Sequence, residues 1–180
     1  FPHFYVTAKV HKKGSLKTRP IISISGSLLE GIGKWTDRQL QPYVKETDSF
    51  VSSSVHLLEM LKEQPPLPPQ ARIFTCDARS MYTNIDTHHG LKTINKWLEL
   101  HQMEILAEHD NFPFALIMEF VMTNNIFQFD DCWFHQQNGT AMGRSVACVY
   151  ATIYYSYHEE TMILPKYKSS LNKGIPLRLQ

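Results

Sequence analysis

The chain has 180 residues, of which 43% are hydrophobic and 19% are charged, and its formal net charge at pH 7 is +1. Such a chain can bury the core of one domain, and its start at Phe1 rather than Met leads us to expect a piece of a longer protein. Its three cysteines lie far apart, which argues against a zinc knuckle or a disulfide framework, and no apolar run approaches a membrane span.

Basic residues are concentrated at the two ends of the chain. Five Lys or Arg residues and no acid precede Glu30, and four more follow Glu160, again without an acid. Scattered charge usually belongs to a solvated surface, but the block Lys9–Lys13 with Lys17 and Arg19 is dense enough to bind phosphate. The N-terminal block is therefore a candidate phosphate-binding surface.

Two strands joined by a turn are predicted first. Phe4–Val10 alternates loosely and is rich in aromatic and branched residues, and Arg19–Ile24 resumes this pattern. Pro20 lies near the start of the second strand, where a missing donor is tolerated. With Lys12–Ser15 as the turn, the two runs predict a basic hairpin.

Two helices and a proline-rich loop are expected next. Ser25–Ser27 opens a helix whose apolar residues have the spacing of one buried face. These residues are Leu28, Leu29, Ile32, Trp35, Leu40 and Val44. A second helix starts near Ser52–Ser54 and runs to Lys62, and the prolines of Gln64–Gln70 end it. That tract has the composition of an SH3 ligand, but we expect a surface connector.

The short apolar run Arg72–Cys76 predicts a buried strand that places Asp77 at its end. A carboxylate in this position can bind Mg²⁺, with substrate phosphates completing the coordination sphere. Tyr82 follows five residues later and could lie under a sugar. These residues suggest a polymerase palm, but the stretch alone fits equally well an Asp that caps the next helix.

Three more helices are predicted in the second half of the chain. Asp86 and Thr87 cap the first, whose apolar residues are Leu91, Ile94, Trp97 and Leu98. The second covers Phe112–Met122, and the third begins at Ser145 and continues through Tyr157. Between the last two, Asn124–Gln136 predicts a hairpin.

The hairpin turns at Asp130 and Asp131, a signature weakened only by the absence of glycine. Acidic residues are common in such turns, so we expect a solvated turn rather than a metal site. Gln137–Gly143 is then a glycine-punctuated loop. Ile175–Leu179 is expected to begin a further strand.

Several possible metal ligands lie close together in the sequence: Asp86, His88, His89, His101, Glu104 and His109. Their spacing does not match an i, i+4 zinc pair, since His88 and His89 are adjacent and point apart on a helix. We therefore expect exposed helix histidines. A metal-dependent hydrolase has no spacing in its favour.

Four ordered motifs resemble the reverse transcriptases of Penelope-like retroelements. Tyr5–Lys12 is similar to the family's opening strand, and Arg19–Ser23 to its Arg-Pro-Ile-Val-Ser. Asp77–Ile85 resembles Asp-x-x-Ser-x-aromatic-Thr-Asn-Ile, and Gln136–Gly143 resembles Gln-x-x-Gly-Thr-Ala-Met-Gly. The resemblance covers essentially the whole chain. It departs at Cys148, where relatives usually carry a proline.

The resemblance implies an α+β polymerase right-hand fold, with the fingers and part of the palm, truncated before the second catalytic strand. Residues 1–70 would form a fingers-like basic hairpin and helices. Residues 71–180 would form the palm core with the first carboxylate strand, the second hairpin and the glycine loop. The family's aromatic-x-Asp-Asp strand follows the helix that begins here at Ser145, and we expect it beyond Gln180.

The implied function is an RNA-directed DNA polymerase, which adds deoxynucleoside triphosphates to a DNA primer on an RNA template. Such nucleotidyl transfer uses two Mg²⁺ ions, with Mn²⁺ as the alternative. The resemblance makes Asp77 the catalytic residue, and Asp77 and the carbonyl of Ala78 the metal ligands. The ring of Tyr82 would exclude a 2′-hydroxyl. The family implies a nuclear location.

The remaining site residues implied by the resemblance contact the substrates. The nucleotide-binding residues would be Lys9, Arg19, Tyr82, Gln136 and Gly139. The nucleic-acid-binding residues would be Lys12, Lys13, Met142 and Gly143. We expect the 180-residue chain by itself to be inactive. A catalytically inactive, polymerase-like domain that still binds RNA is the alternative.

Overall fold

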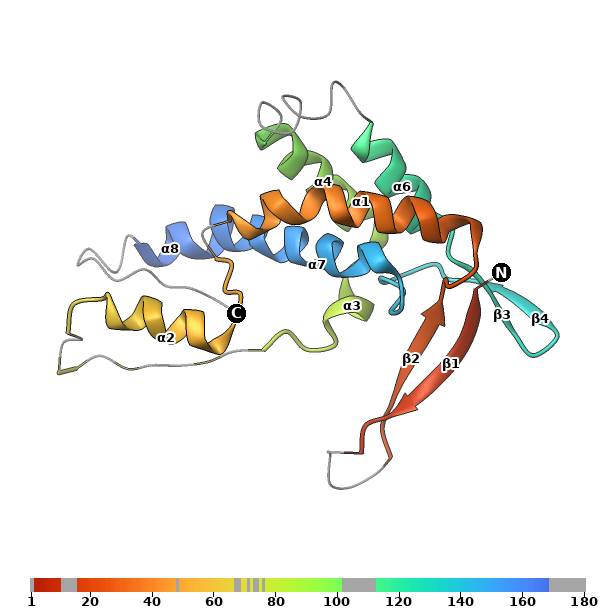
Figure 1. Ribbon diagram of the computed structural model, residues 1–180, viewed down its shortest axis with the longest axis horizontal. Coiled ribbons are helices and arrows are strands. Elements are labelled where there is room, and N and C mark those ends of the chain that lie inside the picture. Colours follow the sequence, from red (N-terminus) through yellow and green to blue (C-terminus); the bar gives the residue numbers. More distant parts are fainter. Residues whose placement is uncertain are drawn as a thin grey trace.

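The computed structural model describes residues 2–10, 16–47, 49–66, 69–70, 72, 75, 77–101 and 113–168. A small mixed sheet lies at one end of a group of helices (Figure 1). The expected α+β class is confirmed, whereas the assignment to a polymerase fold stays a prediction. Within the described ranges, no helix has the length and apolar character needed to cross a bilayer.

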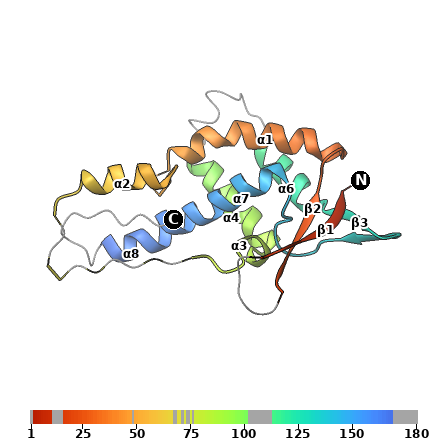
Figure 2. The ribbon, with the colours of Figure 1, turned by 60° about the horizontal axis from the view of Figure 1, so that its bottom comes forward.

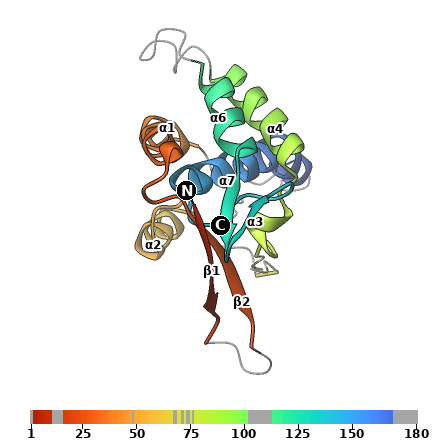
Figure 3. The ribbon, with the colours of Figure 1, turned by 90° about the vertical axis from the view of Figure 1, so that its right-hand side faces the viewer.

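Four strands form the sheet in the order β2-β1-β3-β4. They are β1 (His3–Ala8), β2 (Thr18–Ser23), β3 (Ile126–Phe129) and β4 (Cys132–His135). β1 and β2 are antiparallel, as are β3 and β4, so both predicted hairpins are confirmed. A parallel contact between His3 of β1 and Gln128 of β3 joins them. The β1–β2 hairpin extends away from the helices (Figure 3).

The β3–β4 turn consists of Asp130 and Asp131, as predicted. Asp130 has a φ of 54°, in the left-handed region that Asp tolerates better than most residues. Its carbonyl accepts a hydrogen bond from Nε2 of Gln128 over 3.1 Å. Both acids are exposed, which confirms a solvated turn. The predicted β1–β2 turn at Lys12–Ser15 lies outside the described residues.

Helices α1 (Leu28–Lys45) and α7 (Ser145–His158) pack side by side (Figure 2). The prediction that one large apolar face of α1 is buried is wrong in part, because Leu28 is 97% exposed, and Ile32 and Trp35 are also exposed. The buried residues of α1 are Gly33, Thr36, Leu40, Tyr43 and Val44.

Small residues explain where the buried face of α1 lies. A Cβ on Gly33 would be 3.1 Å from Oγ of Ser145, so glycine lets α7 approach the α1 backbone closely. A pattern that counts large apolar side chains cannot detect such a contact. Trp35 instead stacks on Phe114 of α6 (Phe114–Thr123), with ring centroids 5.8 Å apart.

The other two predicted helices are also present, as α2 (Ser54–Lys62) and α4 (Thr87–Leu100). Three short elements were not predicted: α3 (Met81–Asn84), η1 (Glu159–Ile163) and α8 (Leu164–Lys168). Ser53 caps α2 by accepting from the amide of His56, and Asp86 caps α4 by accepting from the amide of His89. α2 ends before the proline tract and has no buried residue.

The core lies between α1, α4, α6 and α7. Its fully buried side chains include Ile94 and Trp97 of α4, Met118 of α6 and Tyr150 of α7. The predicted apolar face of α4 is therefore confirmed. Residues from both predicted parts, 1–70 and 71–180, share this core, while the division itself stays a prediction.

The structure does not form the predicted strand before Asp77 at the residues it describes. Arg72, Thr75 and Asp77 have no regular secondary structure, and Asp77 is exposed. Ile73, Phe74 and Cys76 lie outside the described residues, as does the predicted strand Ile175–Leu179. In the described part of the chain, the sheet is therefore built from the two hairpins alone.

Candidate functional site

The glycine loop after β4 connects two distant motifs. The backbone amide of Thr140 donates to the carbonyl of Tyr82 in α3 over 2.7 Å. Two residues on, the carbonyl of Met142 accepts from the amide of Ile22 in β2, also over 2.7 Å. The loop is thus held between α3 and β2. Three of the four motifs that carry the family resemblance therefore meet here.

Glycine is required at two positions of this loop. Gly139 has a φ of 79°, and a Cβ on it would lie 2.9 Å from the carbonyl oxygen of Thr83. Gly143 has a φ of 102°, and a Cβ there would lie 2.6 Å from the carbonyl oxygen of Ile22. Both positions combine a left-handed backbone with close contact to another backbone segment, which only glycine accommodates easily.

Gln136 holds the start of the loop. Its backbone amide donates to the carbonyl of Asn125 over 2.9 Å. Its side-chain Nε2 donates to the carbonyls of Asn138 and Gly139, over 2.8 and 3.1 Å. This glutamine is therefore first a loop-stabilising residue, and its Oε1 is left buried without a partner among the described residues.

A cavity of about 300 Å³ lies beside the loop. It is lined by residues of both hairpins, α3 and the loop: Phe4, Pro20, Ile22, Thr83, Phe127, Phe134, His135, Gln136, Thr140, Ala141 and Met142. The structure thus brings the predicted site residues Gln136 and Met142 to one cavity, next to Tyr82 and Gly139. We take this junction as the candidate site.

Tyr82 is half-buried and packs against the edge of the core. Burial raises the pKa of its hydroxyl above the ordinary value, and the neighbouring Cys148 thiol raises it further. Cys148 is the position at which the resemblance departs from the family. The residue that differs from the family pattern, Cys148, therefore lies beside Tyr82, which is expected to contact the sugar.

Asp77 and Ala78 are exposed and lie just before α3. One carboxylate and one carbonyl fit part of a Mg²⁺ site, since this ion commonly takes one or two carboxylates together with phosphate oxygens. Among the described residues, no group of three or more His, Cys, Asp or Glu could hold a metal. A complete two-metal site is therefore not formed by these residues.

Arg19, a predicted nucleotide-binding residue, lies on the face of the first hairpin opposite to the cavity. Side chains alternate along a strand, so Arg19 points away from the face on which Pro20 and Ile22 line the cavity. The amide of Lys9 donates to the carbonyl of Lys17 over 2.8 Å, which continues the hairpin past β1. Arg19 is exposed, and Lys12 and Lys13 lie outside the described residues.

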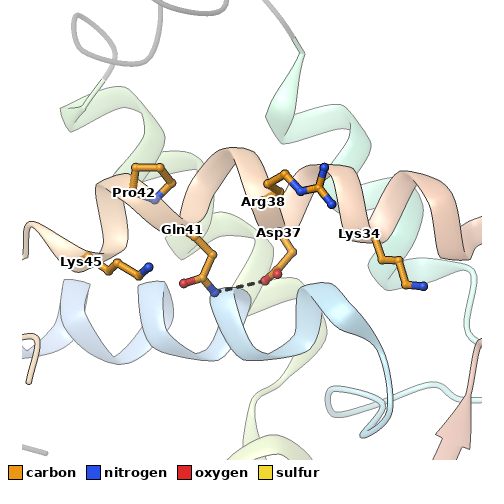
Figure 4. Close-up of a pocket in the computed structure, with 6 residues that line it drawn as sticks. All are labelled: Lys34, Asp37, Arg38, Gln41, Pro42 and Lys45. Carbon is orange, nitrogen blue, oxygen red and sulfur yellow. Dashed lines mark hydrogen bonds between the residues drawn. The ribbon is translucent and has the colours of Figure 1, made fainter. Parts of the chain in front are cut away.

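A second hollow, of about 440 Å³, lies on the surface of α1 (Figure 4). Its lining residues are Lys34, Asp37, Arg38, Gln41, Pro42 and Lys45. Nε2 of Gln41 donates to Asp37 over 3.3 Å, and Lys34 forms an ion pair with Glu30 over 2.6 Å. The hollow on α1 contains none of the predicted site residues and has the character of a solvated helix face.

The residue patterns of the sequence did not identify the aromatic side chains that line the first cavity. Phe127 and Phe134 pair across β3 and β4, with ring centroids 5.7 Å apart, and Phe4 lies 5.6 Å from Phe127. A two-residue turn at Asp130 and Asp131 determines the register that places Phe127 opposite Phe134. That pair was therefore predictable, whereas the approach of Phe4 depends on the parallel contact of β1 with β3.

Comparison with known proteins adds no further assignment. A scan against models of protein families finds no match to this chain, and a search of curated proteins finds none either.

Proposed function

We propose that this chain is the fingers and part of the palm of an RNA-directed DNA polymerase similar to those of Penelope-like retroelements. One observation carries the proposal: the loop Gln136–Gly143 is hydrogen-bonded to both Tyr82 and Ile22. Motifs that are far apart in the sequence, and that were identified by residue type alone, meet at one cavity. A shared substrate site requires such a meeting of the motifs, and this supports the proposal.

In the proposed site, each residue has a role suited to its chemistry. Asp77 and the carbonyl of Ala78 would hold Mg²⁺, which would neutralise charge on the transferred phosphoryl group. Tyr82 would contact the deoxyribose and exclude a 2′-hydroxyl. The resemblance assigns the triphosphate to Arg19, with Lys9, and the guanidinium fork suits this role. Arg19 points away from the cavity, however, so this contact would lie on the opposite face of the β1–β2 hairpin.

The glycine loop and the basic block complete the proposed substrate contacts. Gln136 and Gly139 would border the nucleotide, and Met142 and Gly143 the nucleic acid strand. Lys12 and Lys13 would contact template phosphates. The family resemblance implies a further pair of carboxylates in an aromatic-x-Asp-Asp strand, and the described residues do not contribute this pair. We propose a nuclear location on the family resemblance alone.

An inactive RNA-binding domain is the second candidate function. The observation in its favour is that Asp77 is a single exposed carboxylate, with no three-residue metal cluster among the residues that the structure describes. Two-metal nucleotidyl transfer needs carboxylates from more than one strand. On this candidate function, the domain would bind RNA without extending a primer.

Primer extension separates the two candidates. The assay supplies a DNA primer on an RNA template, the four deoxynucleotides and Mg²⁺. It compares the 180-residue chain with the whole polypeptide that its gene encodes. We expect the whole polypeptide, but not the 180-residue chain, to extend the primer. We expect EDTA to abolish this extension because it removes the metal. RNA binding without extension by the whole polypeptide would favour the inactive domain, and absence of both would overturn the proposal.

A further inference from the structure

Arg144, which lies between the glycine loop and α7, is a buried cation that the sequence patterns did not assign to the site. It is 4% exposed, and within the described residues no carboxylate forms an ion pair with it. Burial lowers the pKa of its guanidinium to about 10, so the group still carries its charge at pH 7. A buried charge is costly unless other groups compensate for it, so the partners of Arg144 must do this.

The partners of Arg144 are backbone carbonyls at the C-terminus of α6. Its Nη1 donates to the carbonyl of Val121 over 2.6 Å, and its Nη2 donates to the carbonyl of Asn124 over 3.1 Å. The last carbonyls of a helix have no partner within the helix, and together they carry a partial negative charge that favours a cation. Arg144 therefore caps α6 from another segment, and the C-terminus of α6 compensates for its charge.

The start of the glycine loop is attached to the same end of α6. The amide of Gln136 donates to the carbonyl of Asn125 over 2.9 Å. Arg144 directly follows Gly143, the last residue of the loop, and binds the carbonyl of the neighbouring Asn124. Both ends of the loop are thus attached to adjacent residues after α6. Because the middle of the loop is bonded to α3 and β2, these two attachments determine where those bonds can form.

The side chain of arginine is suited to this attachment. A guanidinium presents several N–H groups in a rigid plane, so it can donate to two separate carbonyls at once. A lysine ammonium would keep the charge but has a single nitrogen, and a methionine has no donor at all. Since Val121 is fully buried, its carbonyl would be left without a partner if the guanidinium were removed.

We propose that Arg144 is a positioning residue of the candidate site, which fixes the glycine loop where it borders the incoming nucleotide. The inference rests on the proposed function for the nucleotide, whereas the attachment of the loop rests on the hydrogen bonds of Arg144 alone. Arg144 acts through the loop and does not itself contact the substrate. Its loss should therefore weaken nucleotide binding more than it slows the chemical step.

The first measurement is amide hydrogen exchange in the whole polypeptide, read by mass spectrometry in peptides that contain the amides of Thr140 or Ile22. Arg144→Met keeps a long side chain and removes every donor. We expect it to accelerate exchange in these peptides at least about tenfold, as the loss of a charge-assisted hydrogen bond predicts, and to leave α4 unchanged. Arg38→Met, at an exposed position of α1, is the matched control and should exchange like wild type.

The second measurement is steady-state primer extension by the same variants. Arg144→Met should raise KM for the deoxynucleotides roughly tenfold, with a smaller effect on kcat. Arg144→Lys keeps the charge and can still donate to one carbonyl, so its effects should lie between those of wild type and Arg144→Met. If Arg144→Met proves unfolded in a thermal melt, Arg144→Lys decides the question by the same two measurements.

The outcomes distinguish this inference from the proposed function. Equal acceleration of exchange in the loop and in α4 would show that Arg144 supports the whole fold, and it would overturn the inference. Unchanged exchange in the loop, or faster exchange with an unchanged KM, would also overturn it. If the wild type extended no primer, the proposed function would fail, while faster exchange in the loop alone would still support its attachment by Arg144.

Discussion

The backbone amide of Thr140 donates to the carbonyl oxygen of Tyr82 across 2.7 Å, and this bond joins the glycine loop to α3. It fixes the distance between the residue proposed to contact the sugar and the loop proposed to border the nucleotide. The geometry of the site therefore depends on whether the loop can keep its left-handed residues and its close contact with α3.

The first prediction concerns Gly139. Gly139→Ala places a methyl group 2.9 Å from the carbonyl of Thr83 and keeps a φ of 79°, so it should destabilise the protein by at least about 1–2 kcal/mol. Urea denaturation measures the free energy of unfolding. The matched control is Gly31→Ala in α1, where a Cβ has no atom within 4 Å, and it should stabilise by about 0.5–1 kcal/mol. Similar effects at both positions would contradict the loop geometry.

The second prediction concerns a contact in the core. A Cβ on Gly90 would overlap the hydroxyl of Tyr150 and lie 2.9 Å from Cγ2 of Ile85, so Gly90→Ala should cost about 1–3 kcal/mol. Tyr150→Phe removes the overlapping oxygen and a weak hydrogen bond to the carbonyl of Thr87. The double variant should therefore lose less stability than the sum of the losses measured for the two single variants. Strict additivity in thermal or urea melts would show that Gly90 and Tyr150 are not in contact.

The third prediction concerns Glu159 at the start of η1. Burial raises the pKa of this carboxyl above 4.5, Glu160 raises it further, and a hydrogen bond from Ser49 opposes the shift. Because the folded pKa exceeds the unfolded one, protonation stabilises the fold below the unfolded pKa. That contribution is lost as pH rises through the folded pKa.

Glu159→Gln should therefore stabilise the protein at pH 7, by less than about 1 kcal/mol for a partly exposed group, and should have little effect below pH 4.5. Denaturation at the two pH values checks this sign. Glu119→Gln, at an exposed position of α6, is the matched control. A gain that is larger at the acidic pH would contradict the assigned cause.

The fourth prediction concerns Tyr82 and uses the whole polypeptide. If its ring excludes the 2′-hydroxyl, Tyr82→Val should raise ribonucleotide incorporation relative to deoxynucleotide incorporation, with a cost of about 1–3 kcal/mol in normal efficiency. Because Tyr82 also packs on the core, some loss of stability should accompany this change. Tyr157→Val, which truncates another partly buried tyrosine, should leave the ratio unchanged. An unchanged ratio for Tyr82→Val, with both rates reduced, would make Tyr82 a core residue only.

Local residue types were enough to predict most elements of this fold. The N-caps at Ser53 and Asp86, the acidic turn and the glycine loop all depend on short-range chemistry, which the sequence displays directly. The buried face of α1 was not predicted well. Its position follows from the close approach of α7 at Gly33, a tertiary contact that apolar periodicity does not encode.

The candidate site was predictable as a set of residues but not as an arrangement. The resemblance singled out Tyr82, Gln136 and Gly139, yet their common position depends on hydrogen bonds between segments far apart in the chain. The predicted strand before Asp77 is not formed at its described residues. The apolar character of a run does not by itself supply a neighbouring strand to pair with. Thr140 was part of a matched motif, but its unpartnered hydroxyl appears only in three dimensions.

The most direct test of the account is primer extension on an RNA template by Asp77→Asn in the whole polypeptide. The substitution removes one negative charge from an exposed residue, so the fold should be unaffected. Asp131→Asn makes the same change in the exposed β3–β4 turn and serves as the matched control. We predict that Asp77→Asn reduces extension to background while RNA binding stays near wild type, and that Asp131→Asn retains both. Extension by Asp77→Asn at the wild-type rate would contradict the assignment of Asp77 as the metal-binding carboxylate of a polymerase.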